Sequence, residues 1–153
     1  MNLMPLFRST SGRTFVVLPA LLLIAELLLH RGHLQVQPYG VLLIFWGYLQ
    51  YRLSGSYRTR MGEGGPGLRN PPKRLVTSGI FAYTRNPMYL GYLIFLAGLA
   101  ITLRSYIGAA LLVVHIPWFH KRVIRDETRL HGLFGEAYVA YTQSVKRWIP
   151  YTV

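Results

Sequence analysis

Four apolar runs, separated by short polar or basic segments, constrain the fold of this chain most. They cover residues 14–29, 39–53, 88–103 and 106–119. The first is near the short end of the length that crosses a bilayer as a helix, and the last two are short enough that we expect tilt or local thinning of the bilayer. Hydrophobic residues make up 52% of the chain and charged residues 14%. That charged share is about half of the share expected for a soluble domain. The pattern predicts an all-α, polytopic membrane protein with about four transmembrane helices.

The ends of the runs predict how these helices are connected. His30, Arg31 and His33 end the first run as a loop, and no small-x-small cleavage pattern follows, so we expect a retained helix rather than a signal peptide. Only Arg104 and Ser105 separate the last two runs, which predicts an antiparallel helical hairpin. With 153 residues, the chain is expected to form one membrane domain over residues 1–153, with two N-terminal spans within residues 1–54.

Basic residues predict the orientation. Of the 17 Lys and Arg residues, two precede the first run and two (Arg31 and Arg104) lie in the turns after the first and third runs. The other thirteen are Arg52, near the end of the second run, and twelve in the connector 54–86 and the tail. Because basic loops stay inside, we expect the connector, the tail and both ends in the cytoplasm, in the inner or plasma membrane of a prokaryote. Anionic lipid headgroups also explain the net charge of +12 better than nucleic acid does.

The tail after Phe119 is polar but keeps apolar residues at helical steps. This spacing predicts a C-terminal amphipathic helix, which Gly132 and Gly135 bend or break. Its simplest interpretation is a helix lying on lipid, with Arg122 and Asp126 as an exposed ion pair one turn apart.

Several other patterns give weak support for a site. Gly62, Gly64 and Gly67 satisfy G-x-G-x-x-G, but no strand precedes them and Pro66 lies within the motif, so we expect a loop. No cysteine is present, and no histidine pair lies at i, i+4 on a membrane face, so we expect no metal site. His115 is expected to pack or to form a hydrogen bond. Glu26 is expected near the outer end of its helix, where it reaches water.

Residues 75–91, LVTSGIFAYTRNPMYLG, combine polar chemistry with a helix start. Arg85, Asn86, Pro87 and Tyr89 are expected at the cytoplasmic mouth of the third span, where free N–H groups after a proline can face an anion. A snorkelling arginine beside a helix-starting proline explains this segment equally well by itself.

The order of motifs favours the functional interpretation. LVTSGIFAYTRNPMYLG is followed by a two-span hairpin, by RDETRLHGLFGEAYVAY and by VKRWIP. This order resembles the C-terminal catalytic core of the isoprenylcysteine carboxyl methyltransferase family and its phospholipid methyltransferase relatives. The resemblance covers residues 73–150, and Asn86 and Phe81 stand where histidine and tyrosine are commoner in the family.

The resemblance implies an integral membrane methyltransferase that uses S-adenosylmethionine without a Rossmann domain. It implies catalytic roles for Arg122 and Glu127, with Arg122 facing the substrate. The implied cofactor-binding residues are Lys73, Arg74, Leu75, Val76, Phe81, Asn86, Pro87, Met88, Tyr89, Asp126 and Glu127.

Methyl transfer needs few catalytic groups, because an in-line displacement chiefly requires that donor and acceptor are aligned and that water is excluded. Asp126 or Glu127 is expected to bind the ammonium group of the cofactor or to take a proton from an amine acceptor. A carboxylate acceptor needs no base, and Arg122 is expected to orient it. We therefore expect O-methylation of a small or lipophilic carboxylate. The alternatives are a phospholipid or amine N-methyltransferase, and a non-catalytic membrane anchor or transporter subunit.

Overall fold

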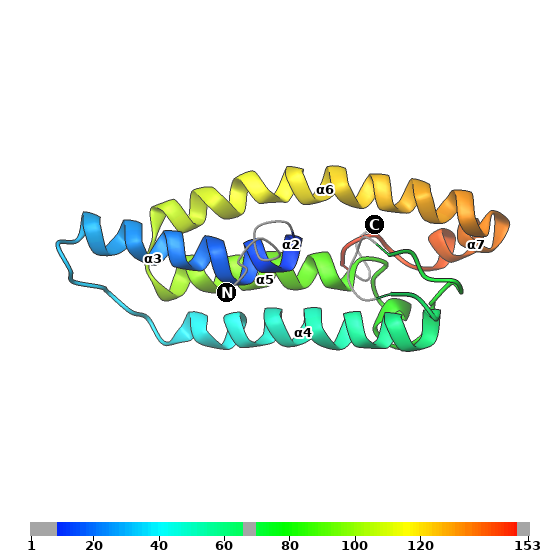
Figure 1. Cartoon of the computed structure of the whole chain (residues 1–153), viewed down its shortest axis with the longest axis horizontal. Coiled ribbons are helices and arrows are strands. Elements are labelled where there is room, and N and C mark those ends of the chain that lie inside the picture. The colour runs from blue at the N-terminus through cyan, green and yellow to red at the C-terminus, as the bar shows by residue number, and fades with distance from the viewer. Residues whose placement is uncertain (1–8, 66–69, 150–153) are drawn as a thin grey trace. The chain divides into compact units, whose positions relative to one another are not determined.

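The computed structural model describes residues 9–65 and 70–149, and all regular secondary structure within them is helical (Figure 1). The predicted all-α class is therefore confirmed for this part of the chain. Pro66 and Gly67 of the glycine motif and Pro150, the end of the predicted catalytic core, lie outside it. The helices are α2 (Thr10–Gly12), a π-helical turn η1 (Arg13–Val17), α3 (Leu18–Leu29), α4 (Tyr39–Gly62), a 3-10 turn η2 (Gly79–Ala82), α5 (Pro87–Thr102), α6 (Tyr106–Phe134) and α7 (Glu136–Ser144).

The chain divides into two compact units. Unit 1 consists of Met1–Tyr48 and Tyr92–Ile116, and unit 2 of Leu49–Gly91 and Pro117–Val153. Helices α4, α5 and α6 each contribute residues to both units. The prediction of one membrane domain over the whole chain stays a prediction.

Unit 1 has a small aromatic core and tight glycine contacts. The ring of Phe15 lies 5.2 Å from that of Tyr48, 5.1 Å from that of Tyr92 and 4.7 Å from that of Phe95. Gly98 allows α5 to approach α4, because a Cβ there would lie 2.6 Å from the backbone nitrogen of Ile44. Such small residues let helix backbones pack closely where lipid tails remove the usual hydrophobic driving force.

The turn between α5 and α6 supports the predicted hairpin. It contains only Leu103–Ser105, and Arg104 adopts a positive φ of 47° within it. The Ser105 amide donates to the Ala100 carbonyl at 2.9 Å, and a Cβ at Gly108 would lie 3.0 Å from the Ala100 Cα. The two helices therefore fold back on each other directly after the turn.

Glu26 does not reach water as expected, because only 3% of its surface is exposed. Its carboxylate accepts a hydrogen bond from the Ser105 hydroxyl and lies 3.2 Å from His30 Nε2. The turns after α3 and before α6 supply these partners, so a buried carboxylate is compensated locally. His115 forms the expected hydrogen bond, with 2.7 Å between its Nδ1 and the Leu111 carbonyl.

Unit 2 is built around the second half of α6. The buried side chains include those of Phe119 and Val123 on α6, of Met88 and Tyr89 on α5, and of Phe81 in η2. The chain reverses at Gly135, which has a φ of 51°, and α7 then returns beside the end of α6 (Figure 1). Tyr138, Tyr141 and Val145 pack there against Leu75, Leu130 and Phe134.

Two helices extend beyond the predicted spans. The second apolar run ends at Leu53, but α4 continues to Gly62, and α6 runs from Tyr106 to Phe134 through Pro117. A change in polarity does not by itself end a helix, and α4 continues through Ser54, Gly55 and Ser56 although these residues favour a helix only weakly. Gly135 separates α6 from α7 as expected, whereas Gly132 lies inside α6.

Two of the described helical segments, Thr10–Leu29 and Tyr106–Phe134, are long and apolar enough to cross a membrane. Helix α5 is apolar but has only 16 residues. Helix α4 has 24 residues, but its tyrosines, Gln50 and Arg52 make it less apolar. The structure therefore agrees with a membrane protein, while four spans and an amphipathic helix on the lipid surface stay predictions.

Candidate functional site

Hydrogen bonds fix the segment that precedes α5. The Thr84 hydroxyl donates to the Arg147 carbonyl at 3.2 Å and accepts from the Asn86 amide at 3.3 Å, and the Arg85 amide donates to the Lys146 carbonyl at 3.0 Å. On the opposite side, Gln50 Nε2 donates to the Pro87 carbonyl at 3.0 Å. Residues 84–86 and residues 146–147, which belong to two of the motifs that carry the resemblance, are thus held against each other in unit 2.

Glu127 joins these segments to α6. Its Oε1 accepts from Asn86 Nδ2 at 3.0 Å and lies 3.5 Å from Arg85 Nε, without hydrogen-bond geometry. Its Oε2 accepts from Arg147 Nε at 3.1 Å and lies 2.9 Å from Arg147 Nη2. Since both oxygens have partners and the residue is only 9% exposed, Glu127 is a buried and compensated charge.

Asp126 contacts different partners from its neighbour. Its Oδ2 accepts a hydrogen bond of 2.6 Å from the hydroxyl of Tyr89, which is 2% exposed. Arg122, one turn earlier on α6, lies close enough to interact with the same hydroxyl and stacks 4.9 Å over the ring of Trp118. The ion pairs of the described residues do not join Arg122 to Asp126, so the expected exposed pair does not form.

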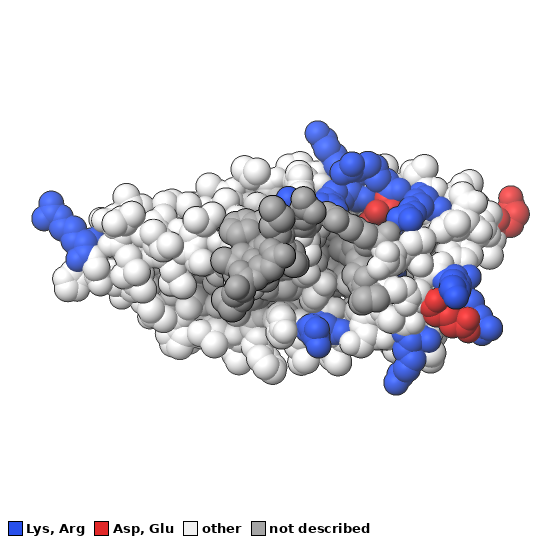
Figure 2. Space-filling model, viewed as in Figure 1, with Lys and Arg blue, Asp and Glu red and all other residues white. Residues whose placement is uncertain are grey.

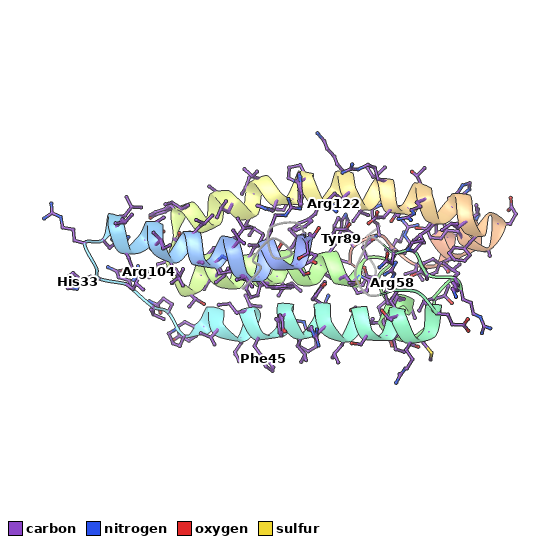
Figure 3. All side chains as sticks on the ribbon, viewed as in Figure 1. His33, Phe45, Arg58, Tyr89, Arg104 and Arg122 are labelled. Carbon is purple, nitrogen blue, oxygen red and sulfur yellow. The ribbon has the colours of Figure 1, made fainter. Side chains whose placement is uncertain are left out.

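A cavity of about 60 Å³ lies beside Asp126 and Tyr89. Figure 3 shows that Arg58, Tyr89 and Arg122 come from three helices, α4, α5 and α6. One carboxylate and three guanidinium groups face or border this cavity together with aromatic rings, so both signs of charge are available beside apolar surface. Its lining residues are Arg58, Pro71, Phe81, Arg85, Asn86, Pro87, Met88, Tyr89, Asp126, Arg129 and Leu130.

Burial changes the ionisation of groups around this site. It lowers the pKa of Arg58, and the Asp126 carboxylate partly offsets that change. Burial, followed by the nearby Glu127 carboxylate, raises the pKa of Tyr138 to about 12. Burial also raises the pKa of Tyr141, whose hydroxyl donates to the Phe81 carbonyl at 2.7 Å. The two tyrosines on α7 are therefore neutral, and Tyr141 holds η2 in place through its hydrogen bond to Phe81.

The structure brings together six of the residues expected to bind the cofactor. Phe81, Asn86, Pro87, Met88, Tyr89 and Asp126 all line the cavity. Lys73, Arg74, Leu75, Val76, Glu127 and Arg122 do not line it. Lys73 and Arg74 are exposed, and their amides donate to the Gly62 carbonyl at 2.7 and 3.0 Å, where they close the loop after α4.

Sequence reasoning did not select Arg58, Pro71, Arg129 and Leu130, and it quoted Arg85 only as part of the motif. Arg58 was missed because α4 was expected to end before it. Arg129 and Leu130 lie three and four residues after Asp126, so helical spacing could have indicated that they share a face with it.

Figure 2 shows basic side chains gathered over the part of α6 that belongs to unit 2, which carries Lys121, Arg122, Arg125 and Arg129. Among the residues that the structure describes, no three His, Asp or Glu side chains gather as they would around a metal ion.

Comparison with known proteins identifies relatives with a shared chemistry. The family described as phospholipid methyltransferase matches residues 37–137, more than half of the chain. The protein-S-isoprenylcysteine O-methyltransferase of Schizosaccharomyces pombe is 35% identical over 83 residues, which cover 54% of this chain and 35% of that protein.

Two further relatives carry the same name. Protein-S-isoprenylcysteine O-methyltransferase B of Arabidopsis thaliana is 36% identical over 84 residues, 54% of this chain and 43% of the relative. The Homo sapiens protein is 32% identical over 78 residues, 50% of this chain and 28% of the relative. Each match spans less than half of the relative's own length. The chain belongs to the phospholipid methyltransferase family and is related, over about half of its length, to the isoprenylcysteine O-methyltransferases.

Proposed function

We propose that this protein is a membrane methyltransferase that uses S-adenosylmethionine and methylates a carboxylate oxygen of a small or lipophilic acceptor. The observation that carries the proposal is the cavity in unit 2, where Asp126 lies among Arg58, Arg85 and Arg129 beside Phe81 and Tyr89. Its relatives are named O-methyltransferases. We also propose four spans, with residues 1–54 and 73–150 as the N-terminal spans and the catalytic core of one domain, and with this site facing the cytoplasm of a prokaryotic cell.

The residues around the cavity suit the amino-acid end of the donor. Asp126, fixed by the Tyr89 hydroxyl, offers a carboxylate to an ammonium group, and the guanidinium groups offer partners to a carboxylate. An enclosed volume of about 60 Å³ is smaller than the roughly 300–1,000 Å³ of typical ligand pockets, so the adenosine part would extend beyond it. The charged side chains around the cavity therefore fit the amino-acid end of the donor, and the cavity has room for only part of the molecule.

When bound, the donor would supply a methyl group from its positively charged sulfur: the acceptor oxygen would bond to the methyl carbon while the carbon–sulfur bond breaks and the neutral thioether leaves. The protein's own contribution is to hold the two reactants and to exclude water. In this proposal Arg122 orients an anionic acceptor; its interaction with the Tyr89 hydroxyl, next to the cavity that it does not line, supports this role. Glu127 and the predicted residues 73–76 support the site from outside the cavity in this proposal.

Methylation of an amine or a phospholipid is the second candidate, favoured by the description of the matching family. An amine acceptor must lose a proton, and Asp126 is the carboxylate that faces the cavity. Turnover would then rise with pH through the pKa of the acceptor, whereas a carboxylate acceptor gives no such rise near neutral pH.

Calorimetric titration of the purified protein with S-adenosylmethionine tests the proposal, followed by transfer of a labelled methyl group to a farnesylated cysteine carboxylate and to phosphatidylethanolamine. We expect saturable binding of the donor and transfer to the carboxylate. Transfer to the amine lipid alone would establish the second candidate. No donor binding would leave the non-catalytic anchor or transporter subunit as the explanation.

A further inference from the structure

The face of α4 in unit 2 has two hollows that the methyltransferase site does not use. The first encloses about 420 Å³ and is lined by Tyr51, Arg52, Gly55, Ser56, Thr59, Arg60 and Met88. The second encloses about 410 Å³ and is lined by Leu53, Ser56, Tyr57, Arg60 and Ile80. Ser56 and Arg60 line both, so the two hollows meet along one stretch of the helix.

The first hollow is suited to a phosphate group. Arg52, Ser56, Thr59 and Arg60 fall on one side of α4 by helical spacing, and the two arginines are about 12 Å apart along the axis at the rise of an α-helix. No acidic side chain lines either hollow. The ion pairs among the described residues include neither Arg52 nor Arg60. Two guanidinium groups that flank two hydroxyl groups thus remain available for an anion.

The second hollow adds apolar surface directly beside these charges. It is lined by Leu53, Tyr57 and Ile80, and Leu53 is 56% exposed. A free phosphate ion or a sugar phosphate would leave this surface exposed to water. A lipid covers it, because the glycerol and the start of an acyl chain lie next to the phosphate in the same molecule.

We propose that the paired hollows on α4 bind the phosphate headgroup of an acidic phospholipid, with the first methylene groups of its acyl chain against Leu53 and Ile80. This site goes beyond methyl transfer. It is distinct from the cavity beside Asp126, because Met88 is the one lining residue that the first hollow shares with that cavity and the second hollow shares none. Gly55 makes room for the Met88 side chain, since a Cβ there would lie 3.3 Å from Met88 Cε.

The test measures retention of phosphatidylglycerol by the full-length protein in detergent micelles, by native mass spectrometry over a range of lipid concentrations. The Arg52→Gln/Arg60→Gln variant is compared with Arg31→Gln/Arg104→Gln, which removes the same number of charges from the turns of unit 1. Each basic residue near an anionic lipid contributes about 1 kcal/mol, so we expect about thirtyfold weaker retention for the first variant. The control should retain the lipid like the wild type.

Further arms separate the possible ligands. Ser56→Leu fills the meeting point of the hollows without changing the net charge, and it should also weaken retention while circular dichroism shows an unchanged helix content. Phosphatidylcholine should bind more weakly than phosphatidylglycerol, and inorganic phosphate at equal concentration should not displace the lipid. Equal losses in both charge variants, equal binding of the two lipids, normal retention by Ser56→Leu, or displacement by phosphate would each overturn the proposal.

Discussion

Asp126 and Glu127 are adjacent on α6, but they contact different sets of partners. Asp126 lines the cavity and accepts from Tyr89, whereas Glu127 does not line it and binds Asn86 and Arg147. Asp126→Asn should therefore weaken donor binding by about 1.5–3 kcal/mol, the value of a hydrogen bond to a charged group, with little change in thermal stability. Titration calorimetry with S-adenosylmethionine, paired with thermal unfolding, measures both effects.

Glu127→Gln is the matched comparison, since it makes the same chemical change one residue later. Arg147 and Arg85 lose a buried anionic partner, so the variant should unfold at lower temperature, with a loss of about 1.5–3 kcal/mol. A stable Glu127→Gln protein with much weaker donor affinity would move the binding role from Asp126 to Glu127.

Arg122 is expected to act on the acceptor. Its planar guanidinium lies over Trp118 and close to the Tyr89 hydroxyl, a position that lysine cannot reproduce. Arg122→Lys should keep donor affinity and lower methyl transfer, and Arg122→Ala should lower transfer further. Single-turnover transfer and donor titration on the same variants measure the two effects. Full transfer by Arg122→Ala would exclude the acceptor role.

Part of the candidate site could be predicted from single residues. Asn86, Pro87, Met88 and Tyr89 are consecutive, so a single motif placed them together before any fold was known. Arg58 could not be found in this way, because its place beside Asp126 depends on how α4 packs against α6. The different partners of Asp126 and Glu127 also could not be predicted, because they depend on the directions of the two side chains and not on their adjacent positions in the sequence.

At the level of elements, the tyrosines of α7 make the stability of unit 2 sensitive to alkaline pH. The pKa of Tyr138 is raised by burial to about 12, above its ordinary value of about 10 in the unfolded chain. Because the folded state holds this proton more tightly, its contribution is complete below about pH 10 and is lost as the pH rises to about 12.

Tyr138→Phe should remove part of this loss, so that unfolding followed by circular dichroism begins at higher pH than in the wild type. Tyr83→Phe is a suitable control because Tyr83 is 62% exposed. Identical alkaline unfolding of wild type and Tyr138→Phe would show that another group titrates.

The contact between α4 and α5 in unit 1 makes a second prediction about elements. Gly98→Ala would place a Cβ 2.6 Å from the Ile44 backbone nitrogen, so the helices must separate and thermal stability should fall. Gly132→Ala is the control, because no atom lies within 4 Å of its Cβ position and Ala favours a helix by about 1 kcal/mol over Gly. Equal melting temperatures for both variants would contradict this close packing.

The elements themselves could be located from the sequence more reliably than their ends. The apolar runs 88–103 and 106–119 correspond to α5 and to the first half of α6. A long apolar run between polar residues indicates a buried or membrane helix, so the existence of these helices could be predicted. The extension of α4 to Gly62 was not predicted, because the apolar run ends at Leu53. Within the extended helix the Ser54 hydroxyl donates to the Gln50 carbonyl, so this polar side chain has a partner inside the helix. A polarity change marks a change of surroundings, and the single Gly55 that accompanies it does not end α4.

At the scale of the whole molecule, charge separates the two units. Four of the 17 Lys and Arg residues belong to unit 1, and the remaining thirteen belong to unit 2. Unit 1 also carries many exposed apolar side chains, including Leu21, Ile24, Leu28 and Phe45. This division suits a unit 1 within the bilayer and a unit 2 at a surface rich in anionic lipid, as the proposed topology requires.

Reporter fusions at the two ends test that topology. Basic segments resist translocation, so both the N-terminal and the C-terminal fusion should report a cytoplasmic location. A third reporter inserted after Gly32, in the turn between α3 and α4, should report the opposite side. Arg31 is the one Lys or Arg residue in that turn, and the apolar helix α3 precedes it. An external signal from the C-terminal fusion would place unit 2 away from cytosolic S-adenosylmethionine. The methyltransferase proposal would then require a different route for its donor, and the acidic-lipid site on α4 would face the leaflet that holds fewer anionic lipids.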